Sequence, residues 1–429
     1  MSLGRGSFYF FDSFLIAGLQ TVVPQLFFLG QAGAGAKTWL GACLLVGAAA
    51  MLAGIQSSRR WSLETVYHRW PRSRPYWLGV PVLLGSGLVA LFSLKSPAVY
   101  LGCYAAVAFM QAYLFNAVDN AWLKTLPIER LKAQGTTAIV AQAAGTVAGP
   151  LFFTLGTGIW TVRGLGAAGA LVTGGALWGL LRTGGLQALR PDPSAPASGN
   201  LAPADRWFLV YGLMVYAATV VLTANVIPIL RNDYRVPDAR RAAALVLAGS
   251  NLVGAGAVLG YFLLPLLVKR RTGSLRVQRP LGHGFPARAH QLIVTALLAG
   301  SALLYLRISV SLPYLLVIGS VFGVSFGFFR LLAREYASRR VALYGKAGLL
   351  TSFNNLHSLA QILGFLAVNA LTWAHRLVSG SLDQTFILAV GGFTLLGGTA
   401  LVGLRRGLRH EAVPDHPLLW SAVAAPAAE

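Results

Sequence analysis

The chain has 429 residues, of which 55% are hydrophobic and only 11% are charged. Soluble domains usually carry about 25% charged residues, so this composition argues against a water-soluble enzyme and against a disordered chain. The formal net charge of +22 would suggest a nucleic-acid partner in a soluble protein, but cytoplasmic loops of membrane proteins also collect Lys and Arg. We therefore expect an integral membrane protein surrounded by lipid, with no nucleic-acid partner.

The apolar runs are long enough to cross a membrane repeatedly. A hydrocarbon core of about 30 Å needs roughly 20 apolar residues per helix. By this measure the sequence predicts twelve transmembrane spans, at residues 8–30, 36–55, 76–94, 97–122, 135–157, 162–182, 206–229, 241–268, 289–308, 311–333, 346–373 and 384–404. The third and fourth spans are separated only by residues 93–96.

The first run has a second interpretation. Arg5, the apolar stretch after it and the small residues at 32–34 also resemble a signal peptide with its cleavage site. The stretch is long enough to span, however, and it contains Asp12, Gln20 and Gln25. We favour a first transmembrane span.

Basic residues predict the orientation. With the N-terminus inside, most of the 35 Lys and Arg residues fall on the inner side, above all in the loops 56–75 and 269–288. The positive-inside rule then places both termini in the cytoplasm. We expect a multi-pass protein of the bacterial inner membrane.

The spans divide into two sets of six. Residues 183–205 are rich in Pro, Ala, Ser and Gly and have no apolar period, which is typical of a flexible linker. The predicted organisation is an N-terminal six-helix bundle (1–182), a cytoplasmic linker (183–205), a C-terminal six-helix bundle (206–404) and a cytoplasmic tail (405–429). The long basic loops recur at matching places in the two halves, as in transporters built from two repeats.

This all-α plan of about twelve transmembrane helices in two bundles resembles the major facilitator superfamily over essentially the whole chain. The family signature after the second span has its counterpart in residues 54–61, where Gly54 and Arg59 match and Ser58 replaces the expected Asp. In the fifth span, Gly145, Gly149 and Pro150 are similar to the core of the motif found in the antiporters of the family. The Gly pair that follows in that motif is missing, and so is the Arg expected midway along the fourth span of proton-coupled exporters.

The resemblance implies a secondary active transporter that moves a small solute by alternating access, acting as a monomer and without a cofactor. The antiporter-like element favours export, and import of a nutrient or metabolite is the alternative. Proton coupling stays open.

Polar groups at membrane depth tend to line water paths or to pair with each other. Asp12 and Gln20 share one face of the first span, and Asn116 and Asp119 share one face of the fourth. In the family, spans 1, 4, 7 and 10 line the central cavity, so these residues are cavity candidates. The alternative places both carboxylates at the cytoplasmic rim, with Asp119 near Arg59 or Arg60.

The eleventh span carries a further polar stripe that includes Asn354, Asn355 and Ser358. Such a stripe cannot face lipid, because each unpaired amide there would cost several kcal/mol. It either lines the cavity or joins helices by hydrogen bonds. His357 lies beside the stripe and is either a packed, hydrogen-bonded side chain or a proton carrier.

Asp119 and Arg330 occupy corresponding places near the ends of spans four and ten. In the family the inner gate forms where these spans meet, so the two charges are a candidate gate pair. Pairing of Asp119 with Arg59 is the competing assignment.

Enzymes are the main rival class. A zinc protease would need a His-Glu-x-x-His motif, and a magnesium-dependent prenyltransferase would need two acidic clusters. The sequence has neither, so we expect no enzyme and no metal site, and we keep a lipid flippase as a further alternative. The predicted membrane interior lacks a Lys/Arg cluster, which argues against multivalent anions and favours an amphipathic or weakly polar substrate.

Overall fold

The computed structural model describes residues 2–16, 36–69, 74–125, 159–182, 201–272, 286–344, 347–378 and 385–409, together with 138, 140–142, 144–149 and 151–152. Every secondary-structure element in these ranges is a helix. The predicted all-α fold is confirmed.

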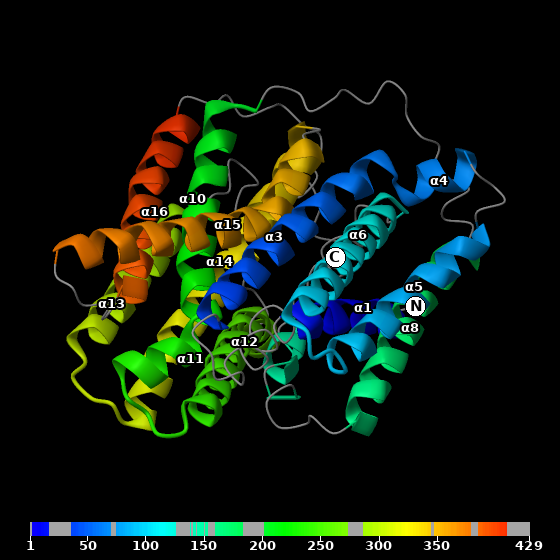
Figure 1. The fold of residues 1–429 in the computed structure, drawn as a ribbon. Helices are drawn as coiled ribbons and strands as arrows, with labels where there is room; N and C mark the ends of the chain where they lie inside the picture. Colours follow the sequence, from blue (N-terminus) through cyan, green and yellow to red (C-terminus); the bar gives the residue numbers. More distant parts are fainter. Residues whose placement is uncertain are drawn as a thin grey trace.

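The N-terminal half forms one bundle, which lies on the right of Figure 1. Its helices are α1 (Ser2–Leu15), α3 (Ala36–Arg60), α4 (Leu63–Arg69), α5 (Arg74–Leu91), α6 (Pro97–Thr125) and α8 (Ile159–Arg182). Residues 93–96 do separate two spans, because α5 ends at Leu91 and α6 begins at Pro97.

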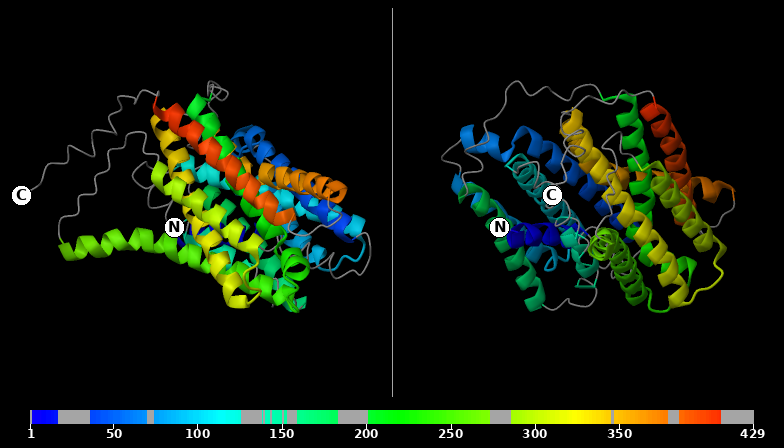
Figure 2. Two further views of the ribbon diagram at one scale, coloured as in Figure 1. Left: turned by 90° about the vertical axis from the view of Figure 1, so that its left-hand side faces the viewer. Right: turned by 180° about the vertical axis from the view of Figure 1, so that it is seen from behind.

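The C-terminal half forms a second bundle beside the first, as the turned views of Figure 2 also show. Its elements are α10 (Pro203–Ala224), α11 (Val226–Pro228), η3 (Ile229–Asp233), α12 (Ala239–Thr272), α13 (Ala287–Leu306), α14 (Leu312–Tyr344), α15 (Ala347–Val378) and α16 (Thr385–Arg409). Within the described residues, seven helices are long and apolar enough to cross a membrane, and three shorter helices are also apolar. Each of these falls on a different predicted span.

The two bundles are packed in the same way. In the first, α3 packs against α6, and α5 packs against both α6 and α8. In the second, α12 packs against α14, and α13 packs against both α14 and α16. These are the same pairings moved along the chain by six spans, so the recurrence of loops in the sequence corresponds to a recurrence in packing.

Glycines allow the closest helix crossings. A Cβ atom placed on Gly54 of α3 would lie 2.5 Å from the Phe109 carbonyl oxygen of α6, and one on Gly323 of α14 would lie 1.9 Å from the Ser250 carbonyl oxygen of α12. Lipid provides no hydrophobic force between helices, so association relies on such close backbone contact.

Two predicted spans differ clearly from the helices observed. The seventh span, predicted as 206–229, breaks after Ala224; the Asn225 amide donates to the Val221 carbonyl oxygen at 2.8 Å, and a short π-helix follows. The tenth span, predicted to end at 333, continues as α14 to Tyr344. Hydropathy detects the apolar part of a helix and does not register where a helix continues in a polar setting.

A short helix also lies in the predicted basic loop 56–75. The Ser62 hydroxyl accepts a hydrogen bond from the Thr65 N–H at 3.3 Å, which caps the start of α4. In the predicted linker, residues 183–200 lie outside the described part, and α10 begins inside its last residues at Pro203. Asp205 there forms a buried ion pair with Arg340 at 2.8 Å, which ties α10 to α14.

Candidate transport cavity

A cavity of about 330 Å³ lies between the two bundles. The N-terminal bundle contributes side chains of α1, α3 and α6, and Gln142 and Thr146 from the predicted fifth span. The C-terminal bundle contributes side chains from α10 to α15. Its lining includes side chains of spans 1, 4, 7 and 10, the spans that line the central cavity in the family.

Asp12 and Ser13 both line this cavity and both are buried. The Gln111 side-chain amide of α6 donates to the Asp12 carboxylate at 3.0 Å. Asp12 thus lines the cavity, and Gln111 links it to the fourth span.

Asp119 is held from two helices. It accepts a hydrogen bond from the Tyr9 hydroxyl of α1 and forms an ion pair with Arg334 of α14 at 3.7 Å. Its ion pair in this structure is therefore made across the bundles, but one helical turn beyond the predicted Arg330. Asn116 also lines the cavity, and its amide donates to the Ala112 carbonyl oxygen of its own helix at 2.9 Å.

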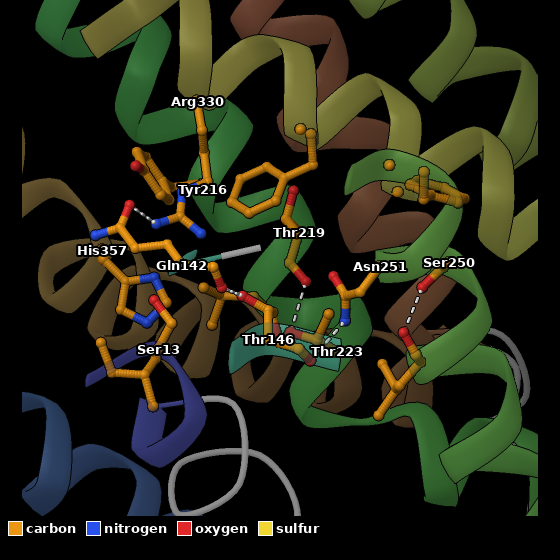
Figure 3. A pocket seen from close by; sticks show the side chains of 18 of the residues that line it. Ser13, Gln142, Thr146, Tyr216, Thr219, Thr223, Ser250, Asn251, Arg330 and His357 are labelled. Atoms are coloured by element: carbon orange, nitrogen blue, oxygen red, sulfur yellow. Dashed lines mark hydrogen bonds between the residues drawn. The ribbon is translucent and has the colours of Figure 1, made fainter. Parts of the chain in front are cut away.

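Arg330 lines the cavity, and Figure 3 shows its guanidinium beside Tyr216 and near His357. Its guanidinium donates to Gln142 Oε1 at 3.4 Å and lies 5.9 Å from the centre of the Phe326 ring. The prediction of a membrane interior without clustered basic residues is wrong, since both Arg330 and Arg334 line the cavity. The sequence places Arg330 at the end of the tenth predicted span and Arg334 just beyond it, and hydropathy does not distinguish a cavity-facing side chain there from a cytoplasmic one.

The polar stripe of α15 lies only partly in the cavity. Ser358 and His357 line the cavity, whereas Asn355 is buried but does not belong to the lining. His357 Nε2 lies 3.4 Å from Gln361 Nε2, and its ring packs edge-on against Tyr216.

Four predicted site positions lie outside what the structure describes. Gln20 and Pro150 are outside the described residues, and the side chains of Arg59 and Asn354 are not described. Their assigned roles stay predictions.

The antiporter-like element packs against the first span. A Cβ atom on Gly145 would lie 2.2 Å from the Phe10 carbonyl oxygen, and Gly149, one turn further, is buried. This contact sets the separation of α1 from the helix that carries Gln142 and Thr146.

Several lining residues are not among the candidates that the sequence predicts, chiefly Gln142, Thr146, Thr219, Thr223 and Asn251. Thr146, Thr219 and Thr223 each donate to a carbonyl oxygen in their own helix, as Figure 3 shows in part. Gln142 and Thr146 are four residues apart in the sequence, as are Thr219 and Thr223, and this spacing places both side chains of a pair on one helix face. Arg330 and Arg334 have the same spacing. This spacing of polar residues is the sequence signal by which the lining could have been found.

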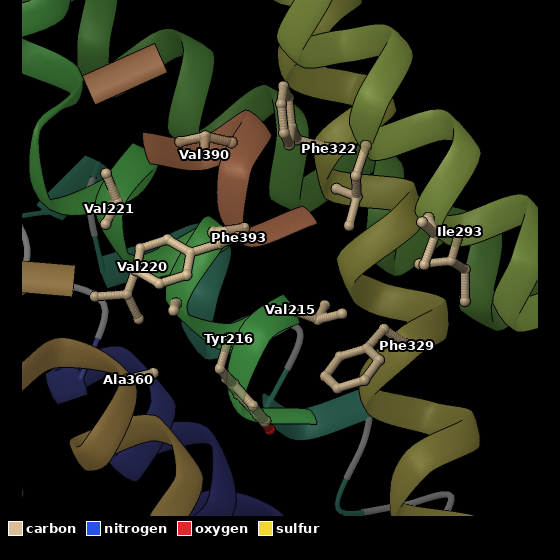
Figure 4. Close-up of a cluster of buried hydrophobic side chains, with 14 of the residues drawn as sticks. Val215, Tyr216, Val220, Val221, Ile293, Phe322, Phe329, Ala360, Val390 and Phe393 are labelled. Atoms are coloured by element: carbon tan, nitrogen blue, oxygen red, sulfur yellow. The ribbon is translucent and has the colours of Figure 1, made fainter. Parts of the chain in front are cut away.

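The rest of the lining is apolar and continues into the core of the C-terminal bundle. Tyr216, Val220 and Phe322 belong to both the cavity lining and the buried cluster drawn in Figure 4. Asn251 of α12 donates to the Thr146 carbonyl oxygen at 3.4 Å and so adds a contact between the bundles. Among the described residues, no group of three or more His, Cys, Asp or Glu side chains is placed to hold a metal ion.

No protein-family model matches the sequence, and no curated protein matches it. Solved structures do match its fold. The nucleoside transporter NupG has a TM-score of 0.58 at 12% identity, covering 96% of this chain and 99% of NupG. The peptide transporter POT in complex with sulfate has a TM-score of 0.63 at 13% identity, covering 95% of each chain.

A bacterial homologue of the human lysosomal transporter Spinster, in an inward-facing and occupied conformation, has a TM-score of 0.55 at 13% identity over 98% of this chain and 95% of that one. These neighbours are transporters rather than enzymes. The chain has their fold, which is the fold that the resemblance implied.

Proposed function

We propose that the protein is a secondary active transporter that moves a small amphipathic solute through the cavity between its bundles by alternating access. The observation that carries the proposal is the cavity itself, which is lined from both bundles and has polar groups set in an apolar surface. A transport site between two repeats lets each bundle form half of the binding surface, so rocking of one bundle against the other exposes the site to each side in turn.

Export is the proposed direction, and the support for it is the element formed by Gly145 and Gly149, which is similar to that of antiporters. A nutrient or metabolite importer is the alternative, and the neighbours include a nucleoside and a peptide transporter. Accumulation in inside-out rather than right-side-out vesicles would support export, and the reverse would support import.

The proposed orientation has both termini in the cytoplasm of a bacterial inner membrane, with residues 183–205 linking the bundles on that side. Its support is the positive-inside distribution of Lys and Arg. A membrane-impermeant maleimide should label Lys95→Cys in intact cells and leave Arg60→Cys unlabelled until the membrane is opened. The opposite pattern would invert the topology.

Transport itself is tested by counterflow in proteoliposomes, with a panel of radiolabelled anionic, neutral and cationic amphipathic solutes. At least one solute should show saturable counterflow. Thr219→Trp should reduce it by about tenfold or more, because the indole would overfill the cavity.

Thr399→Trp is the matched control, since Thr399 is exposed on α16 and a large side chain there leaves the cavity unchanged. Uptake that stays linear with concentration for every solute, or equal loss in both variants, would reject the carrier proposal.

A further inference from the structure

Arg330 differs from the neighbouring arginines of α14 in its partners. Arg334 forms an ion pair with Asp119, and Arg340 forms one with Asp205. Arg330 contacts neutral groups, namely the Gln142 amide oxygen and the Phe326 ring. Within the ranges that the structure describes, it forms no ion pair with a carboxylate.

A guanidinium in this position needs compensation. Charged groups removed from bulk water are costly unless they are paired and hydrogen-bonded, and the hydrogen bonds of Arg330 with the Gln142 amide and with Tyr216 supply no negative charge. Because Arg330 lines the cavity, a bound solute can supply the missing negative charge. The side chain lies where Tyr216, Gln142 and His357 converge in Figure 3, so a ligand atom there also meets their polar groups.

The remaining lining restricts the kind of anion. Arg334, the other cavity-lining arginine, is already paired with Asp119, so one cation is left for the solute, and a multivalent anion would leave charge uncompensated. The planar fork of a guanidinium matches a carboxylate in bidentate geometry. Phe322, Phe326 and Val220 provide an apolar surface for the rest of the molecule.

We infer that the cavity binds an amphipathic monocarboxylate, with its carboxylate on Arg330 and its apolar body against the side chains of α10 and α14. This inference rests on the proposed transport function and names the substrate class for the same cavity. Asp12 and Asp119 reach the cavity from the N-terminal bundle, so a cationic solute held by these carboxylates is the competing outcome.

The test measures binding to the purified full chain in detergent by isothermal titration calorimetry. Three probes of similar shape are compared: 3-phenylpropionate, its neutral amide, and the cation 3-phenylpropylamine. The carboxylate should bind with the highest affinity. Arg330→Gln should weaken its binding by about 10–100-fold, since hydrogen bonds to charged groups are lost, while the amide should change little.

Arg330→Lys keeps the charge but loses the fork, and it should recover part of the affinity; this variant also shows that a loss in Arg330→Gln is not a folding failure. Arg406→Gln is the matched control, because it removes an exposed positive charge from the end of α16, and it should bind as the wild type does. The inference is overturned if the carboxylate does not bind, if amide or amine binds as well as it does, or if Arg330→Gln leaves its affinity unchanged. Saturable counterflow of a neutral or cationic solute would then still support the transporter, so the two failures are distinguishable.

Discussion

At the scale of single residues, the charged side chains that line the cavity differ in their partners. Asp12 is hydrogen-bonded to one amide, Asp119 is held by a tyrosine and an arginine, and Arg330 contacts only neutral groups among the described residues. A carboxylate bonded by a neutral amide can gain and lose a proton without breaking an ion pair. Asp12 is therefore the stronger candidate for a proton-coupling group, and Asp119 for a structural or gating one.

The first prediction concerns Asp12. Asn at this position keeps the size and can still accept the Gln111 hydrogen bond, but it cannot bind and release a proton. We expect Asp12→Asn to abolish gradient-driven accumulation of a solute found by counterflow, while exchange without a gradient continues. Accumulation at the wild-type level in proteoliposomes with an imposed pH gradient would exclude Asp12 as the coupling site.

The second prediction concerns the partner of Asp119. Asp119→Arg should lower transport strongly and reduce the free energy of unfolding by about 1–3 kcal/mol, because a buried, hydrogen-bonded charge loses its partners. Adding Arg334→Asp should restore transport in part, since the two charges are exchanged across the same contact. Adding Arg330→Asp should restore less.

Counterflow rates of the two double variants decide between these assignments. Greater recovery with Arg330→Asp would indicate that the predicted pair forms in a conformation other than this one. Recovery only with Arg59→Asp would favour the loop pairing within the N-terminal half.

At the scale of helices, glycine contacts set how closely the paired helices approach. Gly323 of α14 crosses α12 at the Ser250 carbonyl oxygen, whereas Gly256 of α12 has no neighbouring atom within 4 Å of an added Cβ. The two positions carry the same residue type in similar helices and differ in their contacts.

The third prediction uses this difference. Gly323→Ala should reduce the free energy of unfolding by about 1–3 kcal/mol, because the added methyl group forces α12 and α14 apart. Gly256→Ala should leave stability unchanged or raise it by about 0.5–1 kcal/mol, since Ala is the better helix former. Thermal unfolding in detergent measures both, and equal effects would show that the crossing is not as tight as described.

The helices were largely predictable because the length of an apolar run indicates whether it can cross a membrane. The split at residues 93–96 was found from four residues alone. The break after Ala224 could not be predicted from hydropathy, because Asn225 and Pro228 lie in a run whose hydropathy stays high. The hydrogen bond from the Asn225 side chain that accompanies the break does not change the hydropathy of the run.

The cavity was predictable only in part. Asp12, Asn116 and Asp119 stand out because acids and amides are rare in apolar runs, and Ser358 stands out because it shares a stripe with Asn354 and Asn355. Thr219, Thr223 and Ser250 do not stand out, because a hydroxyl can donate its hydrogen bond to a carbonyl oxygen of its own helix wherever the helix lies. The cavity-lining role of Arg330 and Arg334 could not be predicted, because it depends on which way α14 faces, and only the packing of the helices determines that.

At the scale of the whole molecule, the central claim is that the two bundles move against each other about the cavity. Among the described residues, the side-chain contacts across them include the hydrogen bonds of Asn251 to Thr146 and of Arg330 to Gln142, both 3.4 Å long, and the ion pair of Asp119 with Arg334 at 3.7 Å. Contacts of this length are weak, which suits an interface that opens and closes.

The most direct measurement is the distance between spin labels on the two bundles, by pulsed electron resonance in lipid. One pair, Lys95→Cys with Val310→Cys, lies in the α5–α6 and α13–α14 loops at one end of the bundles; the other, Arg60→Cys with Arg406→Cys, lies near the ends of α3 and α16 at the opposite end. When solute or a pH gradient is applied, the account predicts that one distance lengthens while the other shortens. Two distances that stay fixed, or that change in the same direction, in protein that still catalyses counterflow would contradict it.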